Sequence, residues 1–175
     1  MKVVSNSGPL INLAKVGQFT LLQDLFHNIM IPPEVFEEIV VRGVGQPGAW
    51  ETYTAQWIIR GVIEQPDIVN LLTAELDRGE AEAIALALQE RADWLLIDER
   101  VGRRFAQRAG LQVKGTLGIL LEGVRRNAIH DLQPVLDTLV AKGTWIAPAI
   151  YTEVLKLAQE IQHSGGGGNP EGRVH

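Results

Sequence analysis

Four oxygen-bearing residues lie at the predicted ends of strands and helices in the first hundred residues: Asn6, Glu38, Glu80 and Asp98. Carboxylate and amide oxygens bind hard cations such as Mg²⁺ and Mn²⁺, and this set contains no histidine or cysteine. Such ions promote attack on phosphodiesters. The pattern therefore predicts a Mg²⁺ or Mn²⁺ site that acts on phosphodiester bonds, with Asn6 contributing an oxygen but no charge.

Asp98 is the strongest candidate of the set. It directly follows residues 94–97 (WLLI), an apolar run that is typical of a parallel strand covered on both faces. Ligands of open α/β sheets bind at the carboxyl ends of such strands. The alternative is that Asp98 only caps the next helix, because aspartate is a preferred N-cap residue.

Glu80 begins a helix predicted over residues 77–90. It stands three residues after Asp77, which is the spacing of a capping box. At 100° per residue, Glu80 also lies beside Ile84 on a small, apolar side of the helix, whereas Glu82 lies on a side that reads as solvated. The sequence thus favours Glu80 as a metal ligand and predicts that Glu82 is a surface residue.

The spacing of Glu38 and of Asn6 leaves two interpretations open for each residue. Glu38 borders the apolar Val35/Ile39 face of a helix that starts at Pro32-Pro33, and a solvated acidic face explains it equally well. Asn6 follows the first strand, where an amide can bind a cation or simply form a turn with Ser7.

Basic residues follow Asp98 closely. Arg100, Arg104 and Arg108 are spaced by four residues, so they share one side of a helix and are candidates to bind substrate phosphates. The alternative is a solvated face in which Glu99 pairs with Arg103.

Short apolar strands alternate with helices along the chain. Strands are predicted at 3–4, 29–31, 57–59, 62–63, 94–97 and 113, and residues 43–50 are predicted to be a loop. Helices are predicted at about 10–26, 32–40, 77–90, 101–109, 117–125, 131–141 and 148–162. This alternation predicts an α/β fold with a central, mostly parallel sheet. We expect one domain over residues 1–162 and a disordered Gly-rich tail over residues 163–175.

Composition narrows the class of protein. The 175 residues include no cysteine, which excludes disulfides and thiolate chemistry. No apolar run approaches the length of a membrane span and no signal-peptide pattern is visible, so we expect a cytoplasmic protein without a membrane partner. The net charge of −5 means that binding of nucleic acid would require a local basic patch.

Five motifs occur in order along residues 1–160: VVSNSGPLI (3–11), IPPEVFEEI (31–39), GEAEAIALA (79–87), LLIDER (95–100) and GTLGILL (115–121). Together they resemble the PIN-domain superfamily, in particular a prokaryotic branch. The resemblance implies a three-layer α/β/α sandwich and a Mg²⁺- or Mn²⁺-dependent endoribonuclease. It also implies a toxin of a toxin–antitoxin pair, with an antitoxin protein and a homodimer as partners.

The resemblance also implies roles for individual residues. The acids of the family correspond to Glu38, Glu80 and Asp98, and Asn6 stands where relatives carry the first acid. Asp98, Glu80 and Glu38 are the implied catalytic residues, and with Asn6 they are the implied metal ligands. The implied substrate-binding residues are Ser7, Arg100, Arg104 and Thr116.

The departure at position 6 leaves two interpretations of function. One is a metal-dependent endoribonuclease that acts on RNA, and the other is a catalytically degenerate PIN-like module that binds RNA or a protein. A regulatory acid pocket is a weaker third option, because no lysine partner is evident in a late strand-end loop.

Overall fold

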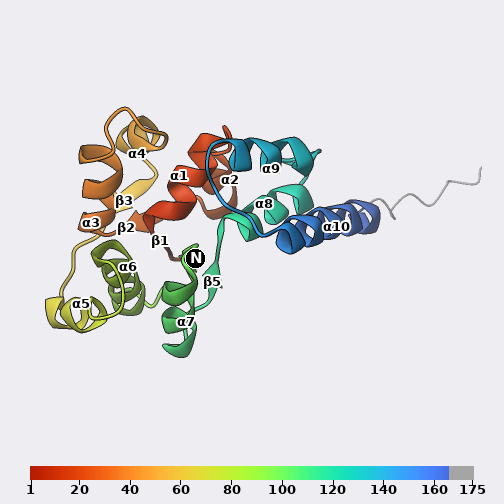
Figure 1. Ribbon diagram of the computed structural model, residues 1–175. Helices are drawn as coiled ribbons and strands as arrows, with labels where there is room; N and C mark the ends of the chain where they lie inside the picture. Colours follow the sequence, from red (N-terminus) through yellow and green to blue (C-terminus); the bar gives the residue numbers. More distant parts are fainter. Residues whose placement is uncertain (166–175) are drawn as a thin grey trace, which may run out of the picture. The chain divides into compact units, whose positions relative to one another are not determined.

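A five-stranded parallel sheet forms the centre of the described residues, 1–165, of the computed structural model. Its order is β3-β2-β1-β4-β5, with β1 (Val3–Ser5), β2 (Ile29–Ile31), β3 (Ile58–Arg60), β4 (Trp94–Leu96) and β5 (Val113–Lys114) (Figure 1). Every pairing is parallel, and β1 pairs in register with β4 from Val3↔Trp94 to Ser5↔Leu96. The predicted α/β class is confirmed.

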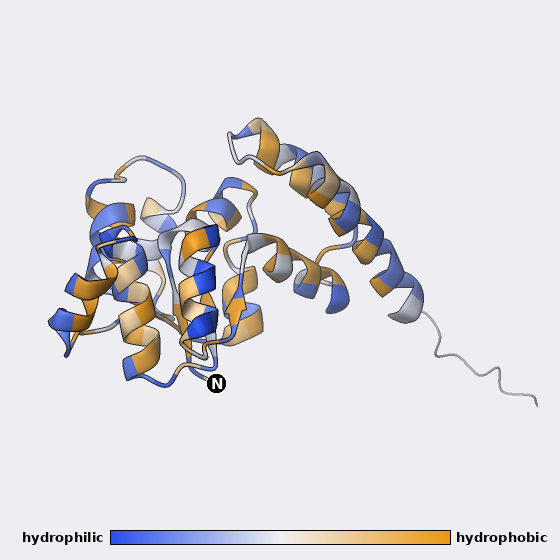
Figure 2. Cartoon of the chain, turned by 60° about the horizontal axis from the view of Figure 1, so that its bottom comes forward, coloured by the Kyte–Doolittle hydropathy of each residue, from blue (hydrophilic) through white to orange (hydrophobic). Residues whose placement is uncertain are grey.

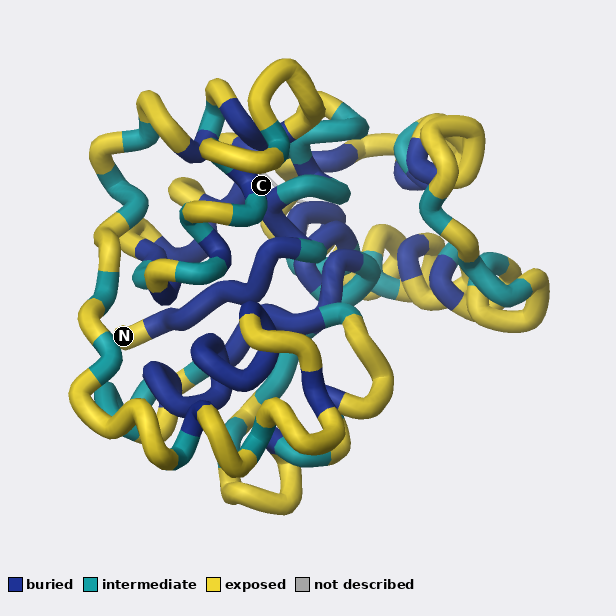
Figure 3. Tube along the Cα trace, turned by 60° about the vertical axis from the view of Figure 1, so that its left-hand side comes forward, coloured by how far each residue is buried: buried dark blue, intermediate teal, exposed yellow. Residues whose placement is uncertain are grey.

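The chain leaves β1 in one direction along the sheet and β4 in the other, so the strand order reverses between these two strands. Ligands of open α/β sheets bind at such a reversal, outside the carboxyl ends of the strands. Asn6 and Asp98 follow the two strands that flank it. In Figure 3 the tube is already buried just after the N-terminus, where β1 enters the core.

Helices connect the strands on both sides of the reversal between β1 and β4. They are α1 (Ser7–Lys15), α2 (Leu21–Phe26), α3 (Pro33–Phe36), the π-helical segment η1 (Glu37–Val41), α4 (Ala49–Thr54), α5 (Pro66–Leu72), α6 (Arg78–Gln89) and α7 (Arg100–Arg108). Apolar and polar residues occupy different sides of the helices (Figure 2). Helix α6 packs on β1 and β4 with an almost wholly buried run from Gly79 to Ala87, because small alanines let its backbone approach the sheet.

Several predicted elements differ from the structure. The loop predicted at 43–50 ends early, because α4 begins at Ala49, and α5 was not predicted at all. Residues 62–63 do not form a strand; Gly61 donates the last ladder bond of this region, to Ile31 O. The helix from Pro33 continues as a π-helix, which its sequence does not reveal.

The chain divides into two compact units, Met1–Thr116 and a second that begins at Leu117. The sheet and every candidate site residue lie in the first unit. In the second, α9 (Leu132–Ala141) packs against α10 (Pro148–Gly165), after α8 (Thr116–Arg125), which starts at the last residue of the first unit. Residues 163–165 of the predicted tail continue α10, and the remainder of that tail lies outside the described residues. No described helix is both long and apolar enough to cross a bilayer.

Candidate metal and phosphate site

Asn6 places an unpartnered oxygen at the end of β1. The residue is only 5% exposed, and its Oδ1 has no hydrogen-bond donor among the described residues. Its backbone N–H donates to Leu96 O at 2.8 Å, which fixes Asn6 between the ends of β1 and β4. A buried oxygen without a donor costs free energy, so this atom indicates a missing ligand such as a cation.

The space in front of Asn6 is bordered by two carboxylates. A Cβ on Gly79 would lie 3.5 Å from Asn6 Oδ1, 3.2 Å from Glu38 Oε2 and 3.6 Å from Asp77 Oδ1. Gly79 is buried and has no side chain, so these three oxygens border one small region. Ser7, also buried, donates a hydrogen bond to the Glu38 side chain.

Burial raises the pKa of Glu38, and the Asp77 charge raises it further, while the Ser7 hydrogen bond and the Arg42 charge lower it. Because the rise prevails, the environment of Glu38 disfavours its negative charge when no cation is present.

Glu80 is more strongly perturbed. It is 6% exposed, and burial, followed by the charge of Asp77, raises its pKa to about 7. The predicted capping box is present: Glu80 N donates to Asp77 Oδ1 at 2.8 Å, and Asp77 N donates to Glu80 Oε2 at 3.2 Å. The other oxygen, Oε1, would lie 3.1 Å from a Cβ on Gly102 of α7. Glu80 therefore takes part in the cap of α6 and also places a buried carboxylate at the site.

Asp98 is held by donors from two elements. Thr116 donates to it through its backbone N at 2.6 Å and its Oγ1 at 2.7 Å, and Asn12 Nδ2 donates to Oδ2 at 3.0 Å. Gly8 leaves room for this carboxylate, since a Cβ there would lie 3.0 Å from Asp98 Oδ2. These bonds fix the orientation of Asp98 beside the first turn of α1.

The expected set of ligands is thus arranged as neighbouring groups. Asn6 and Glu38 meet over Gly79, Glu80 follows directly, and Asp98 lies at the end of the adjacent strand. Within residues 1–165, no three acids or histidines converge closely enough to hold one ion. The amide of Asn6 and two carboxylates, Glu38 and Asp77, border one region over Gly79, and Asp77 was predicted only as a cap.

Ser7 and Thr116 are buried and bond to Glu38 and Asp98 respectively. The sequence predicts both as substrate-binding residues, and the structure places their hydroxyls against the acids. Glu82 was predicted to be a surface residue, and this prediction is wrong: it is 4% exposed, accepts from Glu34 N at 2.8 Å and pairs with Arg78 at 3.1 Å. It anchors the start of α3, which leads to Glu38.

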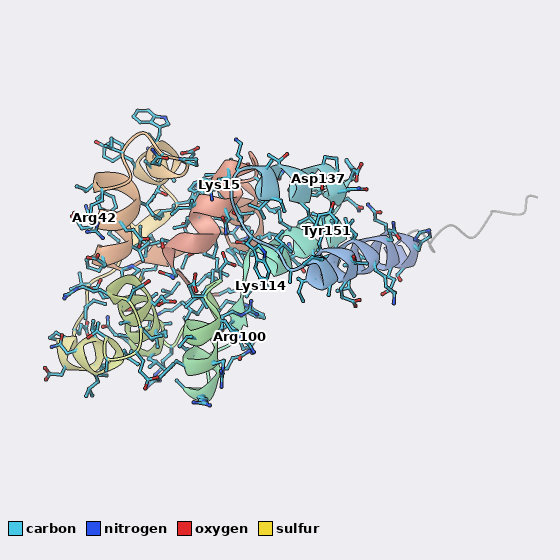
Figure 4. The ribbon with its side chains drawn as sticks, viewed as in Figure 1. Lys15, Arg42, Arg100, Lys114, Asp137 and Tyr151 are labelled. Carbon is cyan, nitrogen blue, oxygen red and sulfur yellow. The ribbon has the colours of Figure 1, made fainter. Side chains whose placement is uncertain are left out.

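Basic side chains line a pocket beside Asp98. The pocket has a volume of about 300 Å³ and is lined by Asp98, Arg100, Arg103, Arg104 and Gln107. Arg100 and Arg104 are exposed, and Figure 4 shows Arg100 on α7 and Lys114 on β5.

The Arg103 guanidinium and the Asp98 carboxylate both lie against Gly115. A Cβ on Gly115 would lie 2.7 Å from Arg103 Nη1 and 2.9 Å from Asp98 Oδ1. The predicted Glu99–Arg103 ion pair is not present, and within residues 1–165 the Arg103 guanidinium has no ion pair. Arg103 is therefore available to an anion next to Asp98, and sequence reasoning did not single it out.

The family model DUF3368, a PIN domain, matches residues 2–160. The chain belongs to this PIN-domain family. The three-layer α/β/α PIN fold inferred from the motifs is confirmed. Comparison with curated proteins finds no match.

PIN domains generally use divalent metals, and their fold is one of nucleases and suggests nucleic acid as a ligand. The residues of this PIN domain fit such an ion on one structural ground: Asn6 Oδ1 is buried without a donor and faces carboxylate oxygens across Gly79. Oxygen-only ligand sets of this kind suit Mg²⁺ and Mn²⁺.

Proposed function

We propose that this PIN domain is a Mg²⁺- or Mn²⁺-dependent endoribonuclease. The observation that carries the proposal is the unpartnered Oδ1 of Asn6, which faces carboxylates at the point where the strand order reverses. Asn6, Glu38, Glu80 and Asp98 would hold the cation. When bound, the ion would polarise the scissile phosphate and make water a better nucleophile.

Burial, followed by the charge of Asp77, raises the pKa of Glu80 to about 7 in the absence of a cation. A bound cation would lower this pKa, so Glu80 would take part as an ionised ligand. Thr116 and Asn12 donate hydrogen bonds to the Asp98 carboxylate and would hold it in one orientation during the reaction.

The RNA backbone would bind in the pocket on α7. Arg103 offers a guanidinium without an ion pair beside Asp98, and Arg100 and Arg104 extend the positive surface outward. An arginine guanidinium can donate two hydrogen bonds to one phosphate, which positions an RNA strand without reading its base sequence. A local patch of this kind allows an RNA ligand despite the net charge of −5.

One observation favours the second function, an RNA- or protein-binding module without catalysis. The amide at position 6 brings no charge, and Glu38, Glu80 and Asp98 do not gather as one ligand group within residues 1–165. Cation affinity depends on the number of charged ligands, so weak occupancy would leave a binding function alone.

Cleavage of RNA in the presence of Mn²⁺ separates these functions. We expect weak cleavage by the native chain, a loss of about a hundredfold or more in Asp98→Asn, and faster cleavage by Asn6→Asp. Asparagine at 98 still accepts from Thr116 N, so it preserves the fold better than alanine does. Binding of RNA without cleavage in all three proteins would support the binding module and refute the nuclease.

The toxin role adds partners to this proposal. A toxin of this class acts in the cytoplasm, forms a homodimer and is inhibited by an antitoxin protein. Trp50, Tyr53 and Val44 are large exposed apolar residues in or just before α4, and the rings of Trp50 and Tyr53 lie 6.2 Å apart. Light scattering of Trp50→Ser against the native chain tests self-association through this surface; a monomeric native chain would refute the homodimer.

A further inference from the structure

Asp77 occupies a position that its capping role does not fully explain. It precedes α6, and its Oδ1 borders the space over Gly79 together with Asn6 Oδ1 and Glu38 Oε2. Three acceptor oxygens from separate segments of the chain therefore approach one point. Neither carboxylate forms a hydrogen bond with the amide oxygen of Asn6.

The Oδ1 of Asn6 accepts no hydrogen bond from the described residues and indicates which kind of group would suit this space. Its residue is 95% buried, and no described residue donates to Oδ1. A buried acceptor that faces two further acceptors is complementary to a positive charge. Asp77 is itself exposed.

We propose that Asp77 supplies the carboxylate that position 6 lacks, and that a divalent cation binds over Gly79 between Asn6, Glu38 and Asp77. The inference rests on the proposed nuclease function in one respect, because the cation is the same. It adds a ligand that neither the five motifs nor the expected acid set includes.

The cap of α6 and the cation site can be separated by substitution. Asp77 caps the helix by accepting from Glu80 N, and asparagine caps helices about as well as aspartate. Asp77→Asn therefore retains the cap and removes the charge. Asp131 offers a matched control, because it caps α9 by accepting from Gln133 N at 3.2 Å and is remote from this acid set in the sequence.

The experiment titrates Mn²⁺ into the full chain without RNA and measures free Mn²⁺ by electron paramagnetic resonance. We expect Asp77→Asn to weaken Mn²⁺ binding by about tenfold or more, since the charge of the ligands sets affinity. Asp131→Asn should bind as the native chain does. The exchange Asn6→Asp with Asp77→Asn should restore affinity to within about threefold, because the ligand charge is again the same.

A second variant guards against a folding defect. Gly79→Ala keeps every charge and improves helix propensity, but its Cβ would lie 3.2 Å from Glu38 Oε2 inside the proposed site. It should also weaken Mn²⁺ binding, with circular dichroism like that of the native chain. Native affinity in Asp77→Asn, or no Mn²⁺ uptake by the native chain, would overturn the inference.

These results are independent of the outcome for the nuclease. Mn²⁺-dependent RNA cleavage with unchanged Mn²⁺ affinity in Asp77→Asn would refute the Asp77 ligand and leave the nuclease standing. Weakened Mn²⁺ binding in Asp77→Asn, in a native chain that never cleaves RNA, would support the site and refute the nuclease.

Discussion

The raised pKa of Glu80 predicts that the metal-free protein loses stability as the pH rises. The folded state holds the Glu80 proton more tightly than the unfolded state, because burial and the Asp77 charge disfavour ionisation. The contribution of this proton to stability is complete below the ordinary pKa of 4.5 and is lost as the pH rises through about 7. The difference corresponds to about 3 kcal/mol in the free energy of unfolding.

Glu80→Gln should remove this dependence. Glutamine cannot titrate, and its side-chain oxygen can still accept from Asp77 N in the capping box. Between pH 4.5 and pH 8, the free energy of unfolding of the native chain should fall relative to that of Glu80→Gln by about 3 kcal/mol. Urea unfolding followed by tryptophan fluorescence at several pH values measures this difference.

Mn²⁺ should counteract the loss above pH 7. A ligand at 100 times its dissociation constant stabilises the folded state by about 2.7 kcal/mol, and ionised Glu80 favours cation binding. At pH 5 the proton competes with the ion, so the same Mn²⁺ concentration should stabilise less. Glu75→Gln, which alters an exposed acid, is the control and should follow the native pH dependence. Parallel stability curves for the native chain and Glu80→Gln from pH 4.5 to pH 8 would refute the reasoning.

Further predictions concern the elements around the acids. Arg103→Ala should weaken RNA binding by about tenfold in fluorescence anisotropy, because an arginine–phosphate contact contributes on the order of 1.5 kcal/mol. Arg108 does not line the pocket, so Arg108→Ala should leave RNA binding unchanged. Equal losses in the two variants would contradict the assignment. Gly115→Ala should weaken RNA binding, because its Cβ would lie 2.7 Å from Arg103 Nη1 and 2.9 Å from Asp98 Oδ1 and would displace both groups; unchanged binding would argue against the pocket. Glu82→Ala should lower the free energy of unfolding by about 1–3 kcal/mol in urea, because it leaves Glu34 N–H without an acceptor, and Glu82→Gln should lose less.

The strand-end placement of Asn6 and Asp98 followed from the sequence because it depends on local signals. Apolar runs mark β1 and β4, and polar residues come immediately after them. The rule that ligands bind where the strand order reverses then places both residues at one edge of the sheet. No tertiary detail is required for this step.

Asp77 and Glu82 could not be assigned in this way. The capping-box spacing gave Asp77 a sufficient local role, so nothing in the sequence pointed to its approach to Glu38, 39 positions earlier in the chain. Helical phase gives the side of α6 on which Glu82 lies. It does not reveal that the first turn of α3 packs on that side and supplies a donor. Both features come from contacts between elements distant in sequence.

Arg103 illustrates the same limit in a different form. Its spacing from Glu99 satisfies the rule for a helical ion pair, yet the pair does not form within the described residues. Exposed pairs of this type contribute little stability, so the guanidinium can lie toward Gly115 at small cost. A spacing rule predicts which residues can meet, and the packing around Gly115 decides which of them do.

The electrostatics of the site give a physical reason for an amide at position 6. Asp77 already raises the pKa of both Glu38 and Glu80, so the metal-free site lacks positive charge. A carboxylate at position 6 would be buried beside these acids and would raise their pKa values further, which would make the empty site less stable. In the proposed site, an amide would keep an oxygen for the cation without this repulsion. In the proposed site, Asn6 together with Asp77 would lower the affinity for the ion only modestly. The same pair would limit the instability of the metal-free state. The position of the charge, and not only the number of acids, would then decide the chemistry available here.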